Sequence, residues 1–111
     1  MPIRGLNKKE VIMQLRIQAI NFVATEALEA HIEKKTKKLT RLFDDILTLD
    51  VYMKVVKPET AENKEAEIRI TAPTVEFFAS KICDTFEEAV DLSLEAIERQ
   101  IAKHKEKLTK K

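Results

Sequence analysis

The sequence predicts an α+β domain with the element order β-α-β-β-β-α. Four short segments alternate apolar and polar residues, which is typical of half-buried strands. Two longer segments repeat apolar residues every three or four positions, which is typical of amphipathic helices. The length of 111 residues is that of one domain. We therefore expect a four-stranded mixed sheet with two parallel helices packed on one of its faces.

The periodic segments set the domain boundaries. Residues 1–12 show no apolar period, and we expect a flexible N-terminal lead there. Residues 13–108 contain all the periodic segments and form the single predicted domain. Residues 109–111 follow the last helical segment, and we expect them to fray.

Each predicted strand presents one apolar face. In the first strand, predicted at residues 11–20, Leu15, Ile17 and Ala19 alternate with polar residues. The same alternation predicts three further strands, at residues 49–56, 65–72 and 75–82.

The first predicted helix begins after Thr25. Threonine is a favourable N-cap, and Glu26 and Glu29 place negative charge at the positive end of the helix dipole. Lys35 lies at the edge of the apolar stripe, and we expect its stem on the core and its ammonium in solvent. The stripe itself predicts the buried face: Leu28, Ile32, Leu39, Leu42 and Phe43.

The second predicted helix has two alternative capping boxes, Asp84 with Glu87 or Thr85 with Glu88. The helix is expected to run to about Lys107. Its long apolar stripe predicts the buried face: Phe86, Val90, Leu94, Ile97, Ile101 and Leu108.

Connection rules predict how these elements lie. A strand–helix–strand unit within one sheet makes the first two strands parallel, with a right-handed crossover. Short connections make the last three strands an antiparallel meander. Each helix follows a strand of the same direction and returns across the sheet. Both helices therefore run the same way on one face, and their C-terminal halves lie at the same edge.

The net charge of +1 conceals a strong segregation of basic residues. Five of the eight residues from Lys34 to Arg41 are basic and none is acidic, and a second basic stretch runs from Arg99 to Lys111, beginning in the C-terminal half of the second predicted helix. A cationic surface of this density is typical of proteins that bind a phosphate backbone. The candidate RNA-binding residues are Lys34, Lys35, Lys37, Lys38, Arg41, Arg99, Lys103, Lys105 and Lys107.

A second interpretation of this charge pattern needs no partner. Both helices are acidic in their early turns and basic in their late turns, which complements the helix macrodipole. Dipole effects fade beyond the last turn and contribute about 0.3–1 kcal/mol per charge. The dense lysines also repel one another, and a bound polyanion relieves that repulsion. The high density of basic residues therefore favours binding of a polyanion. Matching of the helix dipoles remains the alternative interpretation.

The sequence does not predict an enzyme, a metal site or a cofactor. One glycine is too few for a glycine-rich phosphate loop, and no Cys/His spacing resembles a zinc site. We expect Cys83 to be a small buried residue, His31 to be a half-buried packing residue, and His104 to add charge to the second basic stretch below neutral pH. No membrane-spanning run or secretory signal is visible, so we expect a cytoplasmic protein without a membrane partner or small-molecule substrate.

The aromatic residues favour recognition of RNA shape and backbone over the reading of bases. We expect Tyr52 and Phe78 on the open sheet face, where they do not form the paired platform that stacks single-stranded bases. The other four are expected in or beside the core: Phe22, Phe43, Phe77 and Phe86.

Local motifs in both helices match a known family. The first helix opens with Thr25-Glu26-Ala27-Leu28 and contains Lys35 and Lys38-Leu39. The second contains Ala89-Val90-Asp91, Ile97-Glu98-Arg99-Gln100-Ile101 and Lys103-His104-Lys105. With these motifs, residues 13–108 resemble the ribosome hibernation promoting factors, whose sister form is ribosome-associated inhibitor A. The resemblance implies a fold related to the double-stranded RNA-binding domain.

The resemblance also implies a stationary-phase or stress protein that binds the small ribosomal subunit and its rRNA. Members of that family lie between the head and body of the subunit and block the channel of mRNA and tRNA, which inhibits translation without catalysis. A lysine that is common in the second helix of relatives is Ala96 here, which removes one expected phosphate contact. The matched basic positions are Lys35, Lys38, Arg99 and Lys103, with Lys105 and Lys107 in a variable basic end; Lys34, Lys37 and Arg41 are expected from charge density alone.

The chain resembles the short form of that family, without a C-terminal dimerisation domain, and we expect the free protein to be monomeric. Two other functions stay open. One is a general double-stranded RNA-binding module. The other is a protein-interaction domain that docks a partner on the open sheet face or on the acidic first turns of the helices.

Overall fold

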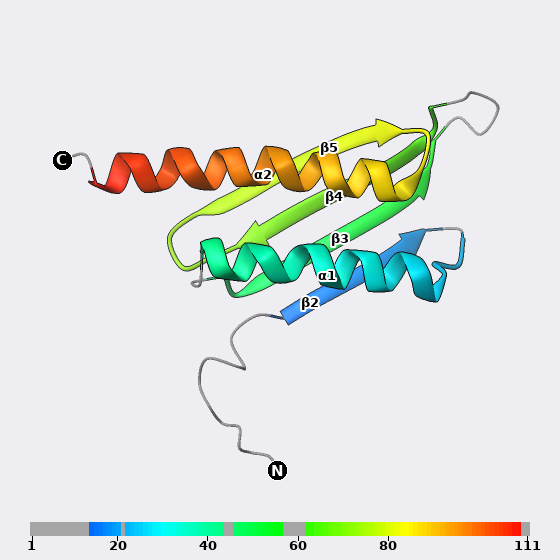
Figure 1. Ribbon diagram of the computed structural model, residues 1–111, viewed down its shortest axis with the longest axis horizontal. Helices are drawn as coiled ribbons and strands as arrows, with labels where there is room; N and C mark the ends of the chain where they lie inside the picture. The colour runs from blue at the N-terminus through cyan, green and yellow to red at the C-terminus, as the bar shows by residue number, and fades with distance from the viewer. Residues whose placement is uncertain (1–13, 21, 44–45, 57–61, 110–111) are drawn as a thin grey trace, which may run out of the picture.

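The computed structural model describes residues 14–20, 22–43, 46–56 and 62–109. The element order in this part of the chain is the predicted β-α-β-β-β-α (Figure 1). The elements are β2 (Gln14–Ile20), α1 (Glu26–Leu42), β3 (Thr48–Val55), β4 (Lys64–Thr71), β5 (Glu76–Cys83) and α2 (Phe86–Thr109). The predicted N-terminal lead and residues 110–111 of the predicted tail lie outside the described residues.

The described strands form one mixed sheet in the order β2-β3-β4-β5. β2 and β3 are parallel, and the pairs β3–β4 and β4–β5 are antiparallel, which confirms the predicted parallel first pair and the antiparallel meander. The register aligns Ile17, Val51, Ile68 and Ala79 in one row across the four strands. Because side chains alternate between the two faces of a sheet, this register puts the apolar residues on one face.

α1 begins and ends where local chemistry can satisfy its backbone. The Thr25 hydroxyl accepts a hydrogen bond from the Leu28 amide at 3.1 Å, which confirms the predicted N-cap. The amide of Phe43 closes the last turn on the Leu39 carbonyl at 2.9 Å. The predicted stripe is wrong at Leu42, which is 41% exposed because it lies at the margin of the stripe in the final turn. Thr36 is buried within the stripe instead.

α2 begins with the second of the two predicted caps. The Thr85 hydroxyl accepts a hydrogen bond from the Glu88 amide at 3.1 Å. One face of the helix is buried, and Ser93 on that face donates to the carbonyl of Ala66 on β4 at 3.3 Å. The buried apolar residues are Ala89, Val90, Leu94, Ile97 and Ile101. Leu108 lies outside the described side chains.

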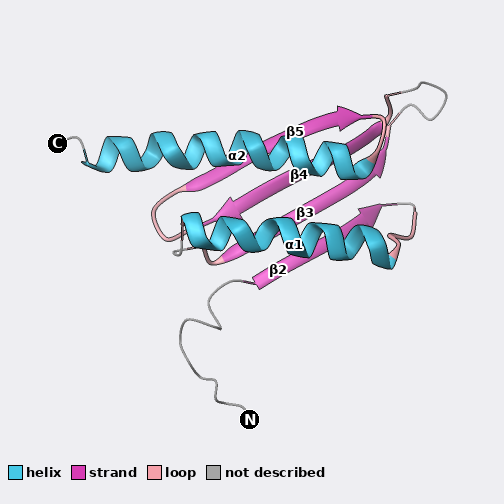
Figure 2. Ribbon diagram, viewed as in Figure 1, coloured by secondary structure: helices cyan, strands magenta, loops and turns pink. Residues whose placement is uncertain are grey.

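A single core lies between the sheet and the two helices, which cover the same sheet face (Figure 2). Phe22 stacks on Phe86 with ring centroids 4.5 Å apart, at the end where both helices begin. Phe77 is buried at the opposite end, and Phe43 contacts its ring edge-on with centroids 5.7 Å apart. The prediction that these four rings lie in or beside the core is confirmed.

The two helices run in the same direction, and their C-terminal ends lie at the same edge of the sheet (Figure 1). Direct contacts join the two ends. The ammonium of Lys105 donates to the carbonyl of Leu42, and the rings of Phe43 and His104 lie edge-on with centroids 5.9 Å apart. The predicted convergence of the helix ends is therefore present in the structure.

Candidate nucleic-acid interface

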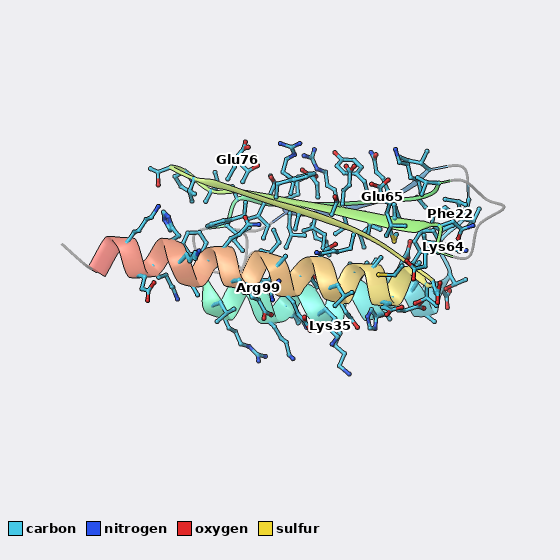
Figure 3. All side chains as sticks on the ribbon, turned by 90° about the horizontal axis from the view of Figure 1, so that it is seen from above. Phe22, Lys35, Lys64, Glu65, Glu76 and Arg99 are labelled. Atoms are coloured by element: carbon cyan, nitrogen blue, oxygen red, sulfur yellow. The ribbon has the colours of Figure 1, made fainter. Side chains whose placement is uncertain are left out.

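The candidate interface is the basic surface, which we define as the nine lysine and arginine residues of the two helices. Eight of them are exposed, and Lys35 is half-buried, with 36% of its side chain accessible. Figure 3 shows Lys35 and Arg99 on the helix layer, and Glu65 and Glu76 on the sheet. The nine residues are Lys34, Lys35, Lys37, Lys38, Arg41, Arg99, Lys103, Lys105 and Lys107.

The two basic stretches are staggered rather than side by side. Contacts between the helices pair His31 with Asp91 near their beginnings and Leu42 with Lys105 near their ends. Residues 34–41 of α1 are therefore level with about residues 94–104 of α2, which include Arg99 and Lys103 from the second stretch. The remaining lysines of α2 begin where α1 ends. The basic surface is a continuous strip that runs from α1 onto the end of α2.

Most charges of the basic surface have no carboxylate partner among the described residues. Lys35 lies 3.8 Å from Asp91, and Lys105 contacts the Leu42 carbonyl. Within the described part of the chain, no ion pair is formed by the other seven: Lys34, Lys37, Lys38, Arg41, Arg99, Lys103 and Lys107. Local carboxylates therefore leave most of the positive charge available to a bound anion.

On the open sheet face, in contrast, the cations form ion pairs with carboxylates. Arg16 forms a two-point hydrogen bond with buried Asp50, at 2.7 and 3.3 Å, and this contact raises the pKa of Arg16 above its ordinary value. Lys54 lies 3.7 Å from Glu65. Arg69 lies 3.6 Å from Glu76 and also stacks over the Phe78 ring at 5.2 Å. All three cations are thus paired with a carboxylate, in contrast to those of the basic surface.

Tyr52 and Phe78 lie on this open face, as predicted, and they do not contact each other. Phe78 is 45% exposed beneath Arg69. Tyr52 lines a hollow of about 210 Å³ together with Ile20, Lys54, Glu65 and Glu67. Both charge signs line this hollow, so it offers no cationic path for a phosphate backbone.

The two histidines have contacts that the sequence did not predict. His31 is half-buried as expected, and its Nε2 also lies at hydrogen-bonding distance, 2.8 Å, from Oδ1 of Asp91 on α2. His104 was predicted as part of the second basic stretch. Its half-buried ring instead packs edge-on against Phe43 and Phe77, at 5.9 and 5.7 Å. Helical spacing could not reveal either contact, because the partners are distant in sequence.

The described residues offer little to other kinds of site. They contain no group of three or more side chains suited to hold a metal ion. Cys83 is buried, as predicted, and burial raises the pKa of its thiol above the ordinary value. Neither described helix is both long and apolar enough to cross a membrane.

The chain belongs to a known family. Residues 15–109 match the family described as Sigma 54 modulation protein / S30EA ribosomal protein. This match confirms the resemblance noted from the helix motifs, since curated relatives carry the name ribosome hibernation promotion factor or ribosome hibernation promoting factor.

Among these relatives, the Bacillus subtilis (strain 168) protein is 33% identical over 101 residues, which are 89% of this chain and 52% of the relative. The Azotobacter vinelandii protein is 33% identical over 95 residues, 86% of this chain and 85% of the relative. The chain thus spans about half the length of the Bacillus relative.

Solved structures share the fold. A ribosomal subunit interface protein from Coxiella burnetii superimposes with a TM-score of 0.74 at 20% identity, over 84% of this chain and 98% of that one. The N-terminal domain of Thermus thermophilus Protein Y superimposes with a TM-score of 0.68 at 22% identity, over 80% of this chain and 94% of that domain. These similarities confirm the predicted α+β architecture.

Proposed function

We propose that this protein is a cytoplasmic ribosome hibernation factor that binds the small ribosomal subunit as a monomer. The basic surface lies on rRNA phosphates, and the body of the domain blocks access of mRNA and tRNA. Translation is thereby inhibited in stationary phase or stress. The names of its relatives, ribosome hibernation factors and subunit interface proteins, support this role.

The observation that carries the proposal is the contrast between the two faces of the domain. On the sheet face, Arg16, Lys54 and Arg69 are each paired with a carboxylate. On the helix face, seven cations have no such partner among the described residues. Helix-dipole matching alone does not require a strip that extends over two helices, because its effect is limited to the last turn. A polyanion bound to the helix face accounts for the contrast.

The strength of such binding can be worked out from counterion release. If four cations of the basic surface each neutralise one phosphate, the slope of log K against log salt is about −3 to −4. Raising salt from 50 to 200 mM then weakens binding about a hundredfold. The matched cations are Lys35, Lys38, Arg99 and Lys103.

Co-sedimentation with purified small subunits tests the proposal. Replacing the four matched cations by alanine should remove binding while the far-ultraviolet circular dichroism stays unchanged, because three of the side chains are exposed and Lys35 is half-buried. A charge-matched comparison uses two double variants, Lys38→Ala/Arg99→Ala on the helices and Lys54→Ala/Arg69→Ala on the open sheet face. Only the first pair should weaken binding. A quadruple variant that still pellets with unchanged salt sensitivity would refute the proposed surface.

Three further measurements test this function against the alternatives. Duplex RNA in modest excess should leave subunit binding intact; loss of binding would indicate a general double-stranded RNA-binding module. The wild type should also inhibit cell-free translation in proportion to subunit occupancy, and the quadruple variant should not. Binding that resists both nuclease and high salt would instead indicate a protein-interaction domain.

A further inference from the structure

The groove between α1 and α2 contains carboxylates that a purely phosphate-binding surface would not carry. A hollow of about 200 Å³ lies there, lined by Lys35 and Lys38 from α1 and by Asp91, Leu94, Glu95 and Glu98 from α2. Glu95 and Glu98 lie level with the densest part of the basic surface. Each carboxylate repels a phosphate that approaches the groove. The groove therefore fits a ligand other than the RNA backbone.

The walls of the groove are two opposed stripes of charge. On α1, His31, Lys35 and Lys38 follow one another at intervals of four and three residues, so they lie on one side of that helix. On α2, the acidic residues Asp91, Glu95 and Glu98 have the same spacing. Because the helices are parallel, these stripes face each other along the groove, basic on one wall and acidic on the other.

The two stripes are joined at one end and apart at the other. Asp91 Oδ1 lies 2.8 Å from His31 Nε2 and 3.8 Å from the Lys35 ammonium. About one turn later, no ion pair or hydrogen bond joins Lys38 to Glu95 or Glu98, and the described structure gives these two carboxylates no other side-chain partner. In this part of the hollow, Lys38 and the carboxylates of Glu95 and Glu98 thus lie near one another without an ion pair among the described residues.

We propose that this part of the groove binds one unpaired guanine base of the RNA, an inference that rests on the proposed function. Guanine carries the acceptors O6 and N7 on one side and the donors N1–H and N2–H₂ on its Watson–Crick edge. The lysine wall would donate to O6 and N7, and a carboxylate of the acidic wall would accept from N1–H and N2–H₂. Buried Leu94 offers an apolar contact for the base.

Chemistry and size both favour a base over other parts of the RNA. A phosphate offers only acceptors, so it leaves the carboxylates unsatisfied. A volume of about 200 Å³ is below the range of drug-sized ligand sites and suits one group of a nucleotide. Bases extruded from bulges and loops are the usual targets of specific RNA recognition. The other bases lack guanine's separation of two adjacent donors from two adjacent acceptors.

Two hairpin RNAs that differ only in one bulged nucleotide, guanosine or adenosine, test this inference by fluorescence anisotropy at fixed salt. The wild type should bind the guanosine hairpin about tenfold more tightly. Glu95→Gln/Glu98→Gln should lose this preference and bind both hairpins somewhat more tightly, because two negative charges are removed. The control Glu87→Gln/Glu88→Gln makes the same charge change at the start of α2 and should keep the preference.

Equal affinity of the wild type for the two hairpins, a preference for adenosine, or a preference that survives in Glu95→Gln/Glu98→Gln would overturn the inference. The failure of this inference and that of the proposed function are distinguishable. Wild type that pellets with small subunits but shows no guanosine preference leaves the proposed function in place and refutes the guanine site. Wild type that fails to pellet with small subunits refutes the proposed function itself.

Discussion

Phe43 holds the end of α1 against α2, so a substitution there tests how packing builds the basic surface. Its amide closes the last turn of α1 on Leu39, and its ring lies edge-on to Phe77 at 5.7 Å and His104 at 5.9 Å. Complete loss of a buried phenylalanine side chain costs about 3–5 kcal/mol. Phe43 is only partly buried, so Phe43→Ala should cost about 2 kcal/mol of unfolding free energy.

Urea unfolding followed by circular dichroism measures this effect. With an m-value of about 1.5 kcal/mol/M, the midpoint should fall by about 1.3 M. Leu42→Ala is the matched control at the neighbouring position, where the side chain is 41% exposed, and its midpoint should move much less. Phe43→Ala removes no charge, yet it should also weaken small-subunit binding under conditions where the variant stays folded, because the end of α1 is no longer held in place. Equal midpoints for the two variants would refute this reasoning.

Three further predictions concern other contacts. Thr25→Ala removes the cap on the Leu28 amide and should cost about 1 kcal/mol in the same urea assay; an unchanged midpoint would show that the cap contributes nothing. The Gln100 side chain accepts from the Phe78 amide at 3.3 Å and donates to its carbonyl at 2.8 Å, so Gln100→Ala should expose the backbone of the β5 edge and raise self-association in sedimentation velocity; an unchanged sedimentation coefficient would show that Gln100 does not protect this edge. Because burial raises the pKa of Cys83, the folded state favours the neutral thiol. Its contribution to the free energy of unfolding is fully present below the ordinary thiol pKa and should be lost as pH rises above that value. A Cys83→Ala variant should lack this loss of stability at alkaline pH.

The elements were predictable because their signals are local. Thr25 starts α1 through a contact three residues away, and alternation along each strand depends on immediate neighbours. The convergence of the helix ends was predictable from connection rules alone. These signals do not require knowledge of how two distant segments pack.

The stagger of the two helices was not predictable, because it depends on how both helices pack on the sheet. His31 meets Asp91 across 60 positions, and Lys105 meets Leu42 across 63. The pattern of apolar residues within one helix does not indicate which residue of the other helix it contacts. For the same reason, the sequence predicted a basic patch without showing that Glu95 and Glu98 line a groove beside it.

The burial of Asp50 was also not predictable from the sequence pattern. Alternation placed it on the open sheet face, which should leave it accessible. In the structure it is buried, because the parallel register sets it beside Arg16, whose guanidinium covers it. His104 shows another limit, since its position among lysines predicted only added charge, whereas its half-buried ring also packs edge-on against Phe43 and Phe77.

The central claim is that the two helices form one cationic surface that a single bound RNA contacts. The salt dependence of small-subunit binding tests it most directly, with Lys34→Ala/Lys37→Ala on α1 and Arg99→Ala/Lys103→Ala on α2 compared with the wild type. Each pair should reduce the steepness of log K against log salt by about 1.4–1.8, and all four changes together by about twice that. If either pair leaves the slope unchanged, only one helix touches the RNA, and the claim is contradicted.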